Sequence, residues 1–185
     1  MKRNPFYKTL QALALLLLAL ATMASAATGL DTDPDTQELY VNMPTTGTKT
    51  VEITADDIAN GLTSFMVYDD GGKASNYSNG AEGMLQLTAP TGYAFLISGE
   101  IMTSTNTSTS DRLTIYDGST DADILGDVDG YWNPYQVYSS GNVIMFRFTS
   151  DASGRAYGFA LKVSVVHVVN VANVDGGEVK VIDGE

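Results

Sequence analysis

The chain has 185 residues, with 22 acidic against 10 basic side chains, a formal net charge of −12 and no cysteine. This excess of negative charge disfavours binding to nucleic acid and to anionic membrane surfaces, because both are themselves negatively charged. The lack of cysteine excludes a disulfide framework, and the length is sufficient for one domain with its own hydrophobic core.

Residues 1–26 have the organisation of a secretory signal peptide. A basic start that includes Lys2 and Arg3 is followed by the apolar run LQALALLLLALA and by an Ala-x-Ala arrangement at Ala24 and Ala26. The apolar run is shorter than the ~20 residues that a membrane-spanning helix needs, so cleavage after Ala26 is expected. The sequence therefore predicts a secreted or cell-surface protein that does not insert into the membrane after cleavage.

Residues 27–37 are predicted to be a flexible polar lead-in, and residues 38–166 to form one β-domain. Short runs rich in β-branched and aromatic residues alternate there with clusters of Gly, Asn, Asp and Ser, which is typical of strands joined by turns. In chain order the strand-like runs are TKTVEITA, SFMVYD, MLQLTA, YAFLISGEIMT, RLTIYD, NVIMFRFTSD and FALKVSVVHVV. A helical period is weak and limited to TADDIANGL. This pattern predicts an all-β fold, an antiparallel β-sandwich.

The last residues, 167–185, contain further strand-like runs around a DGG turn. Two interpretations stay open for them: a final hairpin on the same sheet, or the first strands of a further module in a chain that is truncated after Glu185.

The stretch between the strand-like runs RLTIYD and NVIMFRFTSD is predicted to be loop. Its acidic residues Asp121, Asp123, Asp127 and Asp129 are expected to face solvent.

The same stretch concentrates aromatic residues in the segment DGYWNPYQVYSS, namely Tyr131, Trp132, Tyr135 and Tyr138. Aromatic side chains on a loop can stack on sugars or anchor a protein partner, so these four are candidate ligand-binding residues. The alternative is that Trp132 and Tyr135 fold back and plug one end of the sandwich.

Four stretches, in this order, resemble the CUB domain and specifically its cysteine-free bacterial relatives. They are VYDDGGKASNYSN, LTAPTGYAFLISGEI, DRLTIYDGS, and SSGNVIMFRFTSD followed by YGFALKVSV, within residues 64–166. The resemblance implies a jelly-roll β-sandwich in a secreted or surface protein, acting as an interaction module without catalytic activity. Its partner would be an extracellular protein or a glycan.

The resemblance also implies a calcium site for part of the family. Asp111 matches the family aspartate that opens the signature strand, and Asp151 matches the aspartate of the later Ser-Asp step. The third ligand, a glutamate, is not matched, because Thr103 stands near its position. Calcium prefers six to eight oxygen ligands, so two interpretations stay open: a calcium site, or two aspartates that shape turns.

Catalytic motifs are lacking in the sequence. It has no cysteine nucleophile and no Gly-x-Ser-x-Gly elbow, and the single histidine, His167, lies in the apolar run VVHVV as an expected strand residue. Among so many acids a glycosidase-like carboxylate pair would be expected by chance.

We therefore expect a non-enzymatic, exported interaction module of a bacterial surface or secreted protein. The alternatives are a substrate-targeting module of a secreted hydrolase and a structural spacer in a tandem surface protein.

Overall fold

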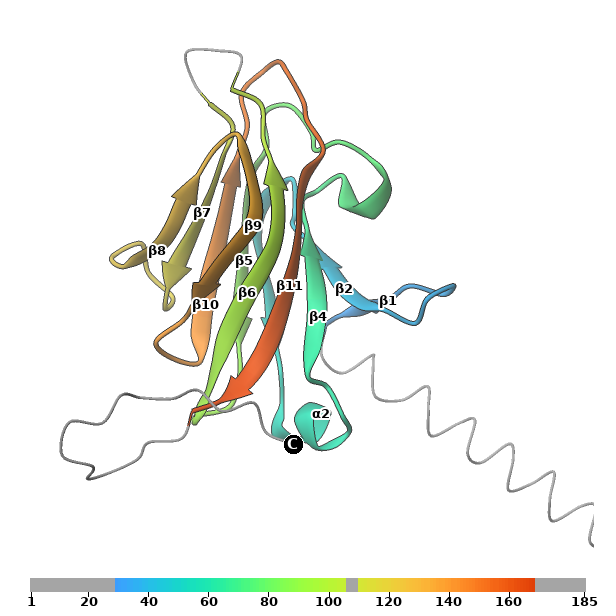
Figure 1. Ribbon diagram of the computed structural model, residues 1–185, viewed down its shortest axis with the longest axis vertical. Coiled ribbons are helices and arrows are strands. Elements are labelled where there is room, and N and C mark those ends of the chain that lie inside the picture. The colour runs from blue at the N-terminus through green and yellow to red at the C-terminus, as the bar shows by residue number, and fades with distance from the viewer. Residues whose placement is uncertain (1–28, 106–109, 169–185) are drawn as a thin grey trace, which may run out of the picture.

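The computed structural model describes residues 29–105 and 110–168, which form a sandwich of two β-sheets (Figure 1). The predicted signal peptide, residues 1–26, and all but the first two residues of the predicted C-terminal segment, residues 167–185, lie outside the described part. In the described residues no helix is long and apolar enough to cross a membrane.

The first sheet has six strands in the spatial order β1-β2-β4-β11-β6-β9. Their bounds are β1 Asp31–Thr32, β2 Leu39–Asn42, β4 Ser64–Tyr68, β11 Gly158–His167, β6 Tyr93–Met102 and β9 Tyr131–Tyr138. The second sheet has five strands in the order β3-β5-β10-β7-β8. Their bounds are β3 Thr46–Glu52, β5 Glu82–Thr88, β10 Val143–Thr149, β7 Arg112–Asp117 and β8 Ile124–Val128.

The predicted β-sandwich is confirmed, with one difference in topology. Most neighbouring strands are antiparallel, but β2 pairs with β4 in parallel and β3 pairs with β5 in parallel. The chain passes from β2 in one sheet to β3 in the other and returns to β4 in the first sheet. The two strands of each parallel pair are thus separated in the chain by one strand of the other sheet, so they run in the same direction. Both sheets are therefore mixed and not purely antiparallel.

The short helix α2, Ala55–Ala59, lies in the connection between β3 and β4. Thr54 caps it: the Thr54 hydroxyl accepts the Asp57 backbone N–H at 3.2 Å, and the Asp57 carboxylate accepts the Thr54 N–H at 2.8 Å. This reciprocal capping box satisfies two backbone donors that a helix start would otherwise leave unpaired, and it explains the weak helical pattern of this segment.

The core lies between the sheets and follows the alternation of each strand. Inward-facing residues of β7 and β10, such as Leu113, Ile115 and Phe146, are fully buried, while residues between them face outward. The six-stranded sheet contributes the corresponding inward side chains, which are Val41, Phe65, Val67, Phe95, Ile97, Ile101, Phe159, Leu161 and Val163. This apolar layer between the sheets is the main source of stability expected for the fold.

The segment expected to be a flexible lead-in contains strand β1. Leu30 is buried in the core, and the carboxylate of Asp33 accepts the backbone N–H groups of Asp35 and Thr36 at 2.9 and 3.1 Å. That turn directs the chain from β1 into β2, so the ordered domain begins before the predicted boundary at residue 38.

The stretch predicted as loop between β7 and β10 forms strands β8 and β9. Asp127, which was expected to be simply solvated, lies on β8 and pairs with Arg112 of β7 at 2.7 Å, and Asp129 pairs with the same arginine at 3.3 Å. Asp121 and Asp123 are exposed in the turn before β8, as expected. The charged residues that suggested a loop therefore lie partly on an edge strand, where solvent reaches their side chains.

Candidate functional site

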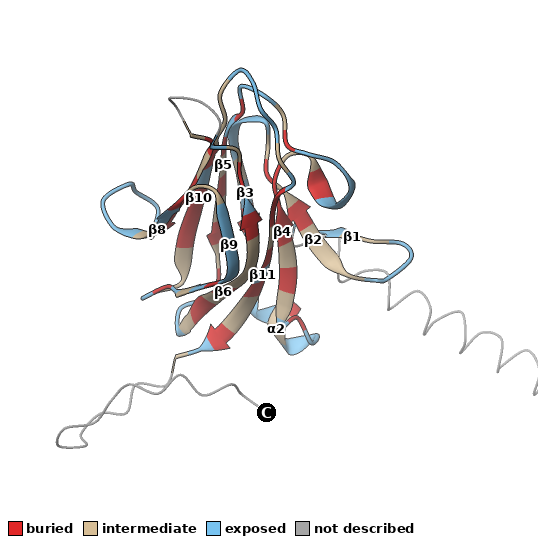
Figure 2. Cartoon of the chain, turned by 45° about the horizontal axis from the view of Figure 1, so that its top comes forward, coloured by how far each residue is buried: buried red, intermediate tan, exposed pale blue. Residues whose placement is uncertain are grey.

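Strand β9 carries the largest group of exposed aromatic side chains among the described residues. Tyr131, Trp132 and Tyr138 are 60%, 49% and 50% exposed, and the strand lies at the edge of the six-stranded sheet, where Figure 2 shows much of it in the colour of exposed residues. The prediction of a loop here was wrong, because Pro134 is accommodated in an edge strand, opposite the irregularity between Gly99 and Ile101 of β6.

Hydrogen bonds fix the three exposed rings. The Trp132 indole Nε1–H donates to the Asp129 carbonyl at 2.8 Å. The Gln136 amide donates to the Tyr138 hydroxyl at 2.7 Å, and the Asn133 amide donates to the Tyr131 hydroxyl at 3.3 Å. Each exposed ring thus has a hydrogen-bond partner on the same strand or just before it, and such contacts favour particular ring orientations.

Met102 of β6 lies opposite Tyr131 in the register of the two strands and is 38% exposed. It extends the apolar surface from β9 onto its neighbour. We call Met102, Tyr131, Trp132 and Tyr138 together the β9 aromatic surface. Met102 was not identified from the sequence, because a single methionine at the end of a strand gives no signal of its pairing partner.

Tyr135 is set apart from the other three predicted aromatic residues. Its side chain turns into the sandwich, is only 6% exposed and belongs to the hydrophobic core. Burial, together with the negative charge of Asp127, raises the pKa of Tyr135 to about 12. Gly126 of β8 makes room for it, since a Cβ atom at this position would overlap the Tyr135 hydroxyl. Tyr135 is therefore a core residue within β9, whereas Trp132 is half exposed, so the two do not together plug one end of the sandwich.

The two aspartates predicted as metal ligands are brought together at one end of the sandwich. The Asp151 backbone N–H donates to Asp111 Oδ1 at 2.8 Å, and the Tyr77 hydroxyl donates to Asp111 Oδ2 at 2.5 Å. Tyr77 also accepts the Ser104 N–H at 2.8 Å. Asp111 and Tyr77 are almost fully buried, at 1% and 0% exposure. Burial, followed by the bond to Asp111, raises the pKa of Tyr77 to about 12.

This arrangement does not fit the calcium site that the family resemblance implies. Both carboxylate oxygens of Asp111 already accept internal hydrogen bonds. The hydroxyl of Thr103, near the position of the family glutamate, accepts the Gly130 N–H at 2.8 Å. Within residues 29–105 and 110–168, no three His, Cys, Asp or Glu side chains form a group that could hold a metal ion, and calcium usually requires more oxygen ligands than two aspartates supply. From these contacts we expect no calcium binding at Asp111 and Asp151.

His167 is the last residue of β11, so the prediction of a strand residue is confirmed. Its ring packs edge-on against Tyr93, with the ring centres 5.0 Å apart. This contact is a structural one between neighbouring strands.

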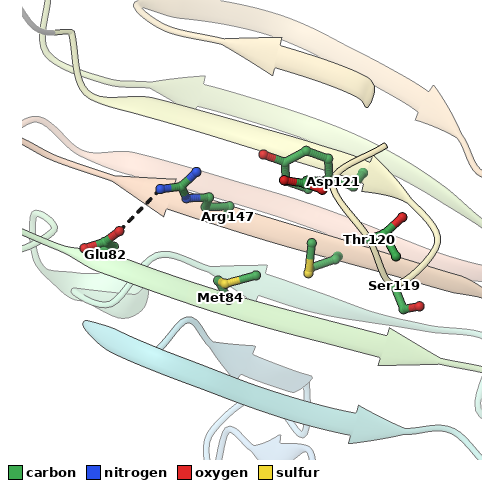
Figure 3. A pocket seen from close by; sticks show the side chains of 8 residues that line it. Glu82, Met84, Ser119, Thr120, Asp121 and Arg147 are labelled. Atoms are coloured by element: carbon green, nitrogen blue, oxygen red, sulfur yellow. Dashed lines mark hydrogen bonds and ion pairs between the residues drawn. The ribbon is translucent and has the colours of Figure 1, made fainter. Parts of the chain in front are cut away.

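A shallow depression of about 450 Å³ lies on the outer face of the five-stranded sheet (Figure 3). Met84, Tyr116 and Met145 contribute to its lining, the loop after β7 borders it with Asp121, and it also includes Arg147. Arg147 forms an ion pair of 3.3 Å with Glu82, and both side chains are well exposed. The depression belongs to the sheet that does not contain β9, and it is a second, separate surface feature.

Solved structures share this fold. The full extracellular region of zebrafish Gpr126/Adgrg6 is similar with a TM-score of 0.51 and 19% identity, over 66% of this chain and 15% of that one. The CUB1-EGF-CUB2 domains of rat MASP-1 give a TM-score of 0.51 and 18% identity, over 66% of this chain and 44% of that one. The CUB1-EGF-CUB2 domain of human MASP-1/3 gives a TM-score of 0.48 and 20% identity, over 57% of this chain and 42% of that one. The chain thus spans less than half of each of these relatives.

Comparison with curated protein sequences gave no significant match. The family model of the CUB domain matches residues 70–163, about half of the chain. This range contains β5 to β10, the aromatic residues of β9, and Asp111 with Asp151. CUB domains are generally non-catalytic interaction modules and occur mostly in extracellular proteins. On the strength of the family match and the shared fold, the chain belongs to the CUB domain family.

Proposed function

We propose that this protein is an exported, non-catalytic module of a bacterial surface or secreted protein that binds an extracellular protein or glycan through the β9 aromatic surface. The leader pattern in residues 1–26 supports export, and the lack of cysteine supports a bacterial origin. The proposed binding of a protein or glycan rests on the chemistry of the β9 aromatic surface and not on the similar proteins.

The observation that carries this proposal is the exposure of three large rings on one strand, each held by a hydrogen bond. Large apolar side chains that gather in the exposed part of one structural element mark a binding site more often than scattered ones do. A spacer domain would gain nothing from exposing these rings. Binding would remove these rings from water, and aromatic residues contribute strongly to such interfaces.

The proposal is tested by isothermal titration of the protein against two panels. The first contains neutral hexasaccharides: cellohexaose, mannohexaose and xylohexaose. The second contains the extracellular proteins collagen and fibronectin. We expect at least one member to bind the parent and the Tyr157→Ala control, which loses an exposed tyrosine outside β9, but not the Tyr131→Ala/Trp132→Ala/Tyr138→Ala variant. Circular dichroism verifies that all variants fold.

Two results would contradict the proposal. One is a lack of binding to every member of both panels. The other is binding that the triple variant retains with the affinity of the parent, since the ligand would then contact another surface.

A further inference from the structure

We infer that the ligand of the β9 aromatic surface is a neutral, linear polysaccharide chain that lies along β9. This inference rests on the proposed function and specifies the ligand class for the same surface. Four features of the strand support it: its lack of charge, the pairing of rings with amides, the distance between its terminal tyrosines, and an edge that is poorly suited to a peptide.

The first feature is electrostatic. Residues 131–138 contain no charged side chain, in a protein with a formal net charge of −12. Of the acids just before β9, Asp127 and Asp129 are both paired with Arg112. The overall charge repels anionic polysaccharides, and a cationic ligand would be attracted to the many acidic residues elsewhere and not to this strand. The neutral strand is complementary to a neutral ligand.

The second feature is the hydrogen-bonding capacity beside the rings. Asn133 and Gln136 each use one amide N–H to hold a tyrosine hydroxyl, which leaves an amide oxygen and a second N–H on each side chain. Sugar hydroxyl groups both donate and accept hydrogen bonds, so they match such mixed donors and acceptors. The apolar faces of sugar rings match the aromatic rings. The exposed side chains of β9 therefore offer both kinds of contact that a sugar chain can use.

The third feature is the distance between the two tyrosines at the ends of β9. Tyr131 and Tyr138 lie at the two ends of β9, and seven residues of extended strand span about 23 Å at ~3.3 Å per residue. Tyr131 and Tyr138 lie opposite Met102 and Leu96 of β6, on the outer face of the sheet, whereas Trp132 lies opposite the buried Ile101, on the other face of the strand. A ligand that contacts both ends has to be extended and longer than a single sugar unit.

The fourth feature disfavours a peptide that adds a strand to the sheet. Pro134 has no N–H to donate, and the register of β9 with β6 is interrupted between Gly99 and Ile101. Proline and bulges are common devices by which edge strands avoid pairing with other chains. A partner is therefore expected to bind to the side chains of β9 and not to its backbone edge.

Trp132 is the single tryptophan of the chain and the neighbour of Tyr131 on β9, so its fluorescence serves as a local reporter of binding to this strand. We would titrate the protein with cellohexaose, mannohexaose and xylohexaose, with the corresponding trisaccharides, and with an anionic hexagalacturonate, at about 50 mM and about 500 mM NaCl. We expect at least one neutral hexasaccharide to change the emission, with a Kd that is nearly independent of salt and about tenfold lower than that of its trisaccharide.

Matched variants locate the contact. Tyr131→Ala and Tyr138→Ala should each weaken binding about tenfold, the scale expected for loss of one aromatic stacking contact, whereas Tyr157→Ala should bind like the parent. Preferential binding of hexagalacturonate would overturn the inference. Binding of collagen or fibronectin through the same residues, with no response to any neutral hexasaccharide, would overturn the ligand class but leave the proposed function intact. A lack of binding to sugars and proteins alike would overturn both.

Discussion

Two tyrosine hydroxyls in the interior of the sandwich should contribute to stability with opposite signs. The Tyr77 hydroxyl donates to the Asp111 carboxylate and accepts the Ser104 N–H. For the Tyr135 hydroxyl, no hydrogen-bond partner is present in the described part of the chain. Replacing either residue by Phe removes the same single atom from a buried ring. The pair of variants therefore isolates the hydrogen bonds from the packing, such as that of Tyr77 against Phe148 with ring centres 4.9 Å apart.

The expected magnitude follows from what each hydroxyl contacts. Tyr77→Phe loses a hydrogen bond to a buried carboxylate, worth about 1.5–3 kcal/mol, and leaves the partly buried Ser104 N–H without its acceptor. We expect a loss of about 2–4 kcal/mol in the free energy of unfolding, and a Tm lower by about 10 °C. Tyr135→Phe removes a buried polar atom without a partner, so its stability should be unchanged or higher.

Urea unfolding followed by circular dichroism measures both values. Equal losses in the two variants, or a loss below about 0.5 kcal/mol in Tyr77→Phe, would refute the reasoning, because the Tyr77–Asp111 contact would then contribute nothing beyond packing.

Three further predictions concern the metal, the pH and a close contact. Because the described donors do not fit calcium, the Tm of the parent should be the same with calcium and with a chelator. Asp111→Ala should lower the Tm by the same amount in both conditions. A calcium-dependent rise in the Tm of the parent that Asp111→Ala abolishes would instead show that calcium binds at Asp111. Asp69 is 1% exposed, and burial raises its pKa from 3.8 to about 6, although the N–H groups of Phe159 and Gly71 oppose the shift. Its contribution to stability is therefore fully present below pH 3.8 and is lost as the pH rises through about 6. Asp69→Asn should flatten the unfolding free energy over that range, and an unaltered pH profile would contradict the shift. Gly126→Ala should lower the free energy of unfolding by about 1–3 kcal/mol, because its Cβ would overlap the Tyr135 hydroxyl. The loss should be smaller when Tyr135 is also replaced by Phe, and an equal loss with and without Tyr135→Phe would exclude this contact.

The sequence identified the strands whose two faces differ in polarity. In β7 and β10 an apolar residue at every second position predicts one face towards the core, and Leu113, Ile115, Phe146 and Phe148 are indeed buried there. Strand β8 lacked this signal, because it is short and its side chains, such as Asp127, are largely exposed at the edge. Strand β9 was missed because Pro134 argued against a strand, although an edge position tolerates proline.

The candidate site was predictable only in part. Local pattern identified the aromatic residues but could not show that Tyr135 faces the core, since this depends on the strand's alternation and on the space left by Gly126. The family resemblance predicted that Asp111 and Asp151 lie together, and the hydrogen bond between them agrees. Tyr77 was overlooked as a partner of Asp111, because the two are 34 residues apart and only the fold brings them into contact.

The central claim is that ligands bind to the β9 aromatic surface, and a map of backbone amide chemical shifts tests it most directly. We would record the spectra of the ¹⁵N-labelled protein before and after adding the panel member with the highest affinity. We expect the largest shifts on β9, Tyr131–Tyr138, and on Met102 of β6. Shifts confined to the depression on the opposite sheet, around Met84, Asp121 and Met145, would contradict it.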